Sequence, residues 1–91
     1  MAQPEPAPDR SSEPKPQFGE VLDVVYSTHG CHRAVVARHD SGVLHVDIEV
    51  WDTSDWALMG FAQWTPAGWT SMTDTLANAL RLARDALGQA A

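Results

Sequence analysis

The sequence predicts an α+β fold: a four-stranded antiparallel β-meander with one C-terminal helix packed on one face, preceded by a disordered tail. Three observations lead to this class: a proline-rich start over residues 1–17, β-branched and alternating segments over 20–64, and an amphipathic stretch after residue 71. A chain of 91 residues is long enough for one domain, which we place at 18–91.

Residues 1–17 hold all but one of the six prolines. Proline fixes φ and removes a backbone donor, and no apolar face accompanies it, so we expect a disordered tail of extended character. It is either an inert leader or a docking motif for a partner that reads proline. We find no secretory signal or membrane-spanning run, and with a single cysteine, Cys31, we expect a cytoplasmic protein.

Four segments joined by short turns are predicted as strands. They are 20–27, 32–39, 43–51 and 56–64. The third is the clearest, because apolar residues from Leu44 to Val50 alternate with polar ones, which is typical of a strand with one buried face. Short turns require antiparallel neighbours. Gly60 and the aromatic residues favour a strand over a helix for the fourth segment, and 65–68 is predicted as a loop.

An amphipathic helix is predicted to follow the sheet. Ser71 with Asp74 three residues later is similar to a capping box, Thr73 is an alternative cap, and Gly88 is the expected end. The apolar stripe of this helix consists of Leu76, Leu80, Ala83 and Leu87. We expect the stripe to cover the apolar face of the third strand, which leaves the other face of the sheet open for a partner or a ligand.

The open face is predicted to carry acidic and aromatic side chains that bind a partner. Strand parity places these residues there. The predicted partner-binding residues are Trp51, Glu49, Asp47, His45 and Asp23. Trp51 is expected to face Trp56 across the turn between the third and fourth strands. Tryptophan is enriched at binding hot spots and acidic fields steer association, although a solvated face and core packing of the tryptophans are the alternatives.

The formal net charge of −6 argues against nucleic acid and anionic membranes as partners. We therefore expect another protein with a basic or neutral surface. A domain this small that lacks a disulfide has a marginal core, so we also expect a homo-oligomer such as a dimer.

His29, Cys31 and His32 gather near the first turn, and histidine and cysteine are ligands that zinc prefers. They are weak candidates for a metal site, since structural zinc normally takes four ligands and no second cysteine exists. We predict no metal and no cofactor. We find no nucleophile–base pair, phosphate loop or cofactor fingerprint, so the sequence favours a protein that is not an enzyme, and we assign no catalytic residue.

Two short segments resemble known families. Thr73–Leu80 is similar to the helix opening of HicB-type antitoxins, and Pro66–Trp69 is similar to a short stretch of MbtH-like proteins. Each likeness covers that segment alone, and we assign no family. The functional hypothesis is a small regulatory or interaction module: an adaptor, an antitoxin, or a phage-type inhibitor that includes a nucleic-acid mimic. The alternative is a small-molecule-binding protein or small dimeric enzyme with its site on the open sheet face.

Overall fold

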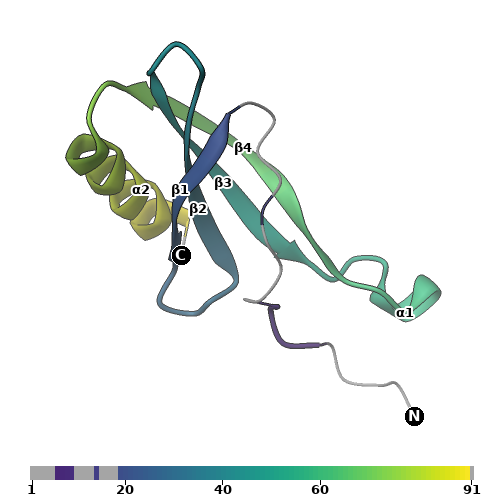
Figure 1. Cartoon of the computed structure of the whole chain (residues 1–91). Coiled ribbons are helices and arrows are strands. Elements are labelled where there is room, and N and C mark those ends of the chain that lie inside the picture. Colours follow the sequence, from purple (N-terminus) through teal and green to yellow (C-terminus); the bar gives the residue numbers. More distant parts are fainter. Residues whose placement is uncertain (1–5, 10–13, 15–18, 91) are drawn as a thin grey trace.

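The computed structural model describes residues 6–9, 14 and 19–90, with the backbone alone for 68–70, 89 and 90. Its elements are β1 (Glu20–Tyr26), β2 (His32–Arg38), β3 (Leu44–Asp52), α1 (Trp56–Met59), β4 (Gln63–Thr73) and α2 (Leu76–Ala90). The strands form one antiparallel sheet in the order β1-β2-β3-β4, and α2 lies along one face of it (Figure 1). The predicted α+β meander with a C-terminal helix is confirmed.

The disordered tail and the cytoplasmic location stay predictions. Most of the predicted disordered segment 1–17 lies outside the described residues, so its disorder and the domain boundary at 18 stay predictions. Within the described ranges, no helix is both long and apolar enough to cross a membrane.

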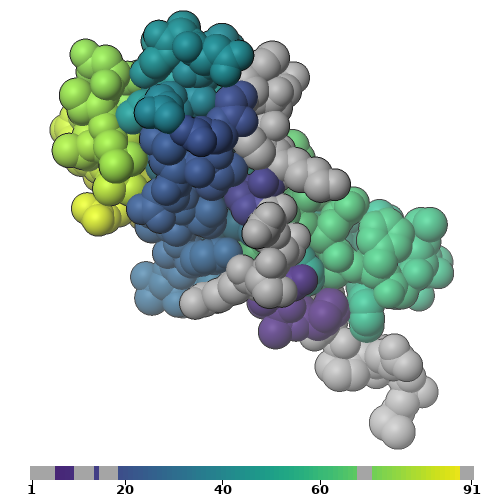
Figure 2. Space-filling view, viewed as in Figure 1, coloured from purple at the N-terminus to yellow at the C-terminus, as the bar shows by residue number. Residues whose placement is uncertain are grey.

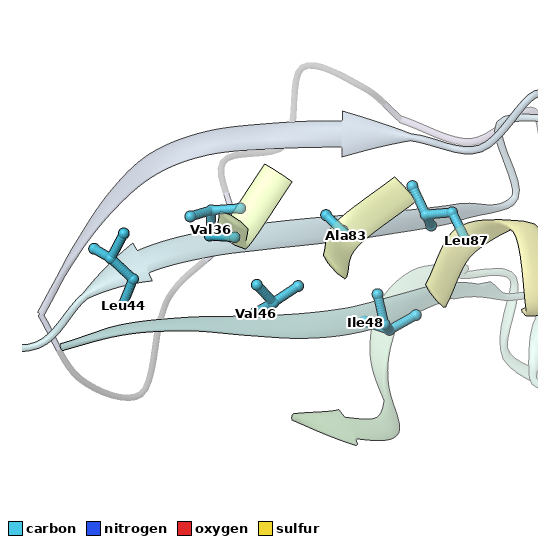
Figure 3. Packing of buried hydrophobic residues seen from close by; sticks show 8 residues of the cluster. Val36, Leu44, Val46, Ile48, Ala83 and Leu87 are labelled. Atoms are coloured by element: carbon cyan, nitrogen blue, oxygen red, sulfur yellow. The ribbon is translucent and has the colours of Figure 1, made fainter. Parts of the chain in front are cut away.

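The core forms where β2 and β3 meet α2. Ala34 lies opposite Ile48 and Val36 lies opposite Val46, and residues directly opposite each other in an antiparallel pair share a face. All four are buried, and together with Leu44 they form the sheet side of the core (Figure 3). The apolar residues of β3 in this core thus face the helix, as the alternation in the sequence predicts.

The helix side of the core differs in part from the predicted stripe. Ala79, Ala83 and Leu87 are buried, whereas Leu76 keeps 45% of its surface exposed and Leu80 is half-buried. The buried positions follow one another four residues apart, as one face of a helix requires. Two of the three are alanines, so the backbone of α2 comes close to the sheet.

Both predicted ends of the helix are wrong. Ser71 lies in β4, and the hydroxyl of Thr75 accepts the hydrogen bond from the backbone N–H of Asn78 at 3.2 Å, which makes Thr75 the N-cap. At the other end α2 continues through Gly88 to Ala90. A glycine in a helix costs only about 1 kcal/mol relative to alanine, which is too little to end a helix held by buried neighbours.

The predicted fourth strand is also misplaced. Residues 56–59 form the one-turn helix α1, which ends at Gly60, where φ is +72° and the N–H donates to the carbonyl of Trp56. β4 then includes the segment 65–68 that was expected as a loop. Pro66 is tolerated there because β4 is an edge strand and the register of the β3–β4 pair shifts between Asp47 and Glu49, beside its partner Glu49.

Ala83→Leu tests the close approach of α2 to the sheet. The added methyl groups meet buried neighbours, so we expect the free energy of unfolding to fall by about 1–3 kcal/mol, as is usual for overpacking. Urea denaturation followed by tryptophan fluorescence measures the change. The control Ala77→Leu makes the same exchange on the exposed side of α2 and should shift stability by less than about 0.5 kcal/mol. Equal effects of the two substitutions would contradict this packing.

Candidate protein-binding site

A buried arginine lies at the centre of the sheet face away from α2. Arg33 is only 2% exposed, and it lies opposite Tyr26 on β1 and opposite Glu49 on β3. Its Nε donates to Oε1 of Glu49 at 2.6 Å, and its guanidinium carbon is 4.3 Å from the ring centroid of Trp64. A charge removed from water is tolerated only when it is paired and hydrogen-bonded, and here a carboxylate and an aromatic face both serve.

Three rings converge over this arginine; we call Tyr26, Trp51 and Trp64 the aromatic cluster. Trp51 lies opposite Trp64 across β3 and β4, with ring centroids 5.3 Å apart in an edge-to-face arrangement at 64°. The centroid of Tyr26 is 6.1 Å from that of Trp64. Tyr26 and Trp64 belong to opposite edge strands, and neighbouring strands are about 4.8 Å apart, so both rings must lean inward over the centre of the sheet.

The N-terminal segment 6–9 lies on the aromatic cluster. The indole N–H of Trp51 donates to the carbonyl of Pro6 at 3.1 Å, and the indole N–H of Trp64 donates to the carbonyl of Asp9 at 2.9 Å. In the space-filling view this segment, in purple, lies against the green surface of β4 (Figure 2). The face that the sequence predicts to be open is therefore partly covered by the chain itself.

The predicted binding residues of β3 do share this face, but their exposure differs. Trp51 belongs to the aromatic cluster, and Glu49, with 20% of its side chain exposed, is held by Arg33. Asp47 is half-buried and His45 is buried. Only part of the predicted acidic surface is therefore accessible, because β2 supplies an arginine that neutralises one carboxylate.

Asp23 does not share this face. It lies opposite Val36, whose side chain is in the core, so the predicted parity of the first strand is wrong. Residues 23–26 pair with β2 without interruption, and Val25, two residues after Asp23, packs on the core. Tyr26 alternates to the other face and lies in the aromatic cluster.

Sequence reasoning also missed the tryptophan that pairs with Trp51. The predicted partner Trp56 lies in α1, and Trp64 takes its place because α1 lengthens the connection between β3 and β4. Arg33 was missed as a site residue as well. The parity of β2 carries a signal for it, since Ala34 and Val36 face the helix and their neighbour must face the other way.

His45 carries a buried polar atom without a partner. Its Nδ1 is 3.4 Å from Oδ2 of Asp47, while Nε2 is buried and has no hydrogen bond in the part of the chain that the structure describes. An unsatisfied buried polar atom costs stability. The position is therefore either a structural cost or a contact that a bound group completes.

The end of β3 carries a further negative charge at Asp52, whose side chain alternates to the other face of the sheet from Trp51. Asp52 follows Trp51, and hydrogen bonds from the side chain and the backbone N–H of Ser54 lower the pKa of its carboxyl. Asp52 is therefore ionised at neutral pH, and its charge is lost only as the pH falls below the ordinary range for aspartate.

The weak metal candidates are not assembled into a site. His29, Cys31 and His32 lie in and beside the connection between β1 and β2, and Cys31 is an exposed free thiol. Among the described residues, no group of three or more His, Cys, Asp or Glu side chains is placed to hold a metal ion. The absence of a metal therefore stays a prediction.

A shallow hollow of about 660 Å³ lies at the turn between β2 and β3, away from the tryptophans. It is lined by Gly19, Glu20, Arg38, His39, Asp40 and Gly42. Three of its polar groups are already used within the chain, because Arg38 pairs with Glu20 and Nδ1 of His39 accepts the N–H of Ser41 at 3.3 Å. The aromatic cluster is thus the stronger candidate site.

No protein-family model matches the chain, and neither the curated proteins nor the solved structures give a significant match. The function of this protein is therefore inferred from the residues of the site themselves.

Glu49→Gln removes the charge that balances Arg33 and keeps the shape of the side chain. We expect the free energy of unfolding to fall by about 1.5–3 kcal/mol, the range for a hydrogen bond to a charged group, because the guanidinium stays buried. Urea denaturation measures the loss. The double variant Arg33→Met/Glu49→Leu removes both charges and should be more stable than Glu49→Gln alone. Wild-type stability of Glu49→Gln would contradict the role of this pair.

His45→Leu replaces the unpartnered ring nitrogen by an apolar group. We expect the free energy of unfolding to rise by about 1 kcal/mol, because a buried polar atom without a hydrogen bond is removed. The midpoint of urea denaturation reports the gain. His29→Leu, on an exposed histidine, is the control and should change stability by less than about 0.5 kcal/mol. A clear loss in His45→Leu would show that the imidazole is needed.

Proposed function

We propose that this protein is a small non-enzymatic interaction module that binds a partner protein through the aromatic cluster and the acidic residues beside it. The observation that carries the proposal is the fixed geometry of Trp51 and Trp64 over the buried Arg33. Rigid aromatic side chains make large contacts at a low entropic cost, and tryptophan and tyrosine are enriched at binding hot spots.

The charge of this surface supports a partner that is basic or neutral. Asp47 lies on the same face of β3 as the aromatic cluster, in a chain with a formal net charge of −6. Such a field speeds the encounter with a positively charged partner and disfavours nucleic acid. A regulatory adaptor, an antitoxin or a phage-type inhibitor, including one that mimics nucleic acid, has these properties.

Self-association and a cytoplasmic location belong to the same proposal. α1 projects at the far end of the β3–β4 pair (Figure 1), and Leu58 and Met59 in it are 89% and 67% exposed. An exposed apolar tip of this kind supports contact with a second copy. The exposed free thiol of Cys31 supports a reducing compartment.

A small-molecule or enzymatic role stands second. The observation that favours it is the hollow at the β2–β3 turn, where Nδ1 of His39 is 3.1 Å from the hydroxyl of Ser41. The pair is weaker as a catalytic arrangement, because both residues are exposed in a tight turn and the same nitrogen accepts the backbone N–H of Ser41.

Asp47→Lys tests the acidic part of the surface. We expect a partner that copurifies from the native host to be lost or weakened at least tenfold, because the substitution reverses a charge on the face that carries the aromatic cluster. Native mass spectrometry of gently purified protein detects the complex, and urea denaturation checks that the variant folds. Asp85→Lys makes the same charge change on the exposed side of α2 and should retain the partner. Equal retention by both variants would contradict the proposal.

A further inference from the structure

The contact between residues 6–9 and the aromatic cluster has the form of a bound peptide. Both hydrogen bonds run from an indole N–H to a backbone carbonyl, at Pro6 and at Asp9. Pro6 and Pro8 are half-buried, while Ala7 and Asp9 are exposed. The chain between the two tryptophans is thus held along its backbone.

The spacing of the two carbonyls matches a polyproline II helix. That helix has three residues per turn, so carbonyls three positions apart, such as those of Pro6 and Asp9, lie on the same side. Proline holds φ near the required value at 6 and 8, and a residue before proline, such as Ala7, is pushed to an extended conformation. The segment is therefore close to its bound conformation before it binds.

The receiving surface is formed by side chains held in place by the sheet. Trp51 and Trp64 are fixed by their position opposite each other on β3 and β4, and Arg33 supports the ring of Trp64 from below. Aromatic grooves that offer an indole donor to a carbonyl are a general mode of recognising proline-rich segments, because the rigid ligand loses little entropy. Nothing in the two hydrogen bonds depends on the side chains of residues 6 and 9, so other segments of this type fit equally.

Resting on the function proposed above, we propose that the aromatic cluster is a binding site for an extended proline-rich segment of a partner protein, and that residues 6–9 occupy it in cis. The partner segment is neutral or basic, since the chain has a formal net charge of −6 and Asp47 lies on the same face of β3 as the aromatic cluster. The cis segment belongs to the same chain as the site, so a partner segment must compete with an intramolecular ligand.

The test keeps the full chain and weakens the cis segment by Pro6→Gly/Pro8→Gly. The probe is a synthetic peptide of residues 2–12 of this chain, and the control peptide has glycine at its three proline positions. We expect the proline peptide to bind the double variant about tenfold more tightly than wild type, because glycine raises the entropic cost of cis occupancy. Fluorescence anisotropy of the labelled peptide gives the affinities, and the indole N–H resonances of Trp51 and Trp64 should shift.

Tryptophan variants in the same background locate the site. Trp51→Phe keeps an aromatic ring but removes the donor, so it should weaken the peptide about tenfold. Trp56→Phe removes a tryptophan that lies outside the aromatic cluster and should leave the affinity unchanged. Equal affinities of the two variants, or binding of the glycine peptide as tight as that of the proline peptide, would overturn the proposal.

Two further outcomes separate this inference from the proposed function. If the native partner depends on Asp47 but the proline peptide does not bind, the ligand class is wrong and the interaction module stands. If the peptide shifts the indole N–H resonances of Trp51 and Trp64 while the native partner binds Asp47→Lys as well as wild type, the peptide site is supported and the acidic surface is not. A wild-type dimer that dissociates in Pro6→Gly/Pro8→Gly would assign the groove to the tail of a second copy and overturn the partner-peptide proposal.

Discussion

The buried guanidinium of Arg33 constrains the whole face away from α2, because a charge withdrawn from water must be compensated on several sides. Glu49 supplies the counter-charge directly opposite on β3, and the ring of Trp64 covers the planar group from β4. Side chains of β2, β3 and β4 thus depend on one ion pair. The rigidity of the aromatic cluster follows from it, since Trp64 is held between Arg33 and Trp51.

The two faces of the sheet are covered in different ways. On one face small and branched side chains meet α2, and Ala79 and Ala83 bring the helix close to the strands. That apolar core is small, as expected for a short chain. On the other face the sheet lacks a second layer of secondary structure in the described part of the chain, and bulky rings with an ion pair take up the space instead. A surface built in this way is stable yet offers donors and aromatic area to a ligand.

Parts of this arrangement were readable from the sequence. The alternation along β3 predicted the core positions Val46 and Ile48, and it placed Trp51 on the other face with the acids. The local pattern was insufficient to show which face of β1 turns toward the helix and where the connection between β3 and β4 lengthens. Pairing with β2 places Asp23 on the helix side, and the short helix α1 makes Trp64 rather than Trp56 the partner of Trp51.

The sequence by itself determined the fold class, the order of the strands and the tryptophan that anchors the candidate site, because periodicity and short turns act between near neighbours. Only the tertiary structure decided that Arg33 is buried against Glu49 and that residues 6–9 meet the tryptophans. Those contacts join positions far apart along the chain, and their partners are set by strand register and by the inward lean of the edge-strand rings. The local pattern of residue types in the sequence shows neither the strand register nor the direction in which these rings lean.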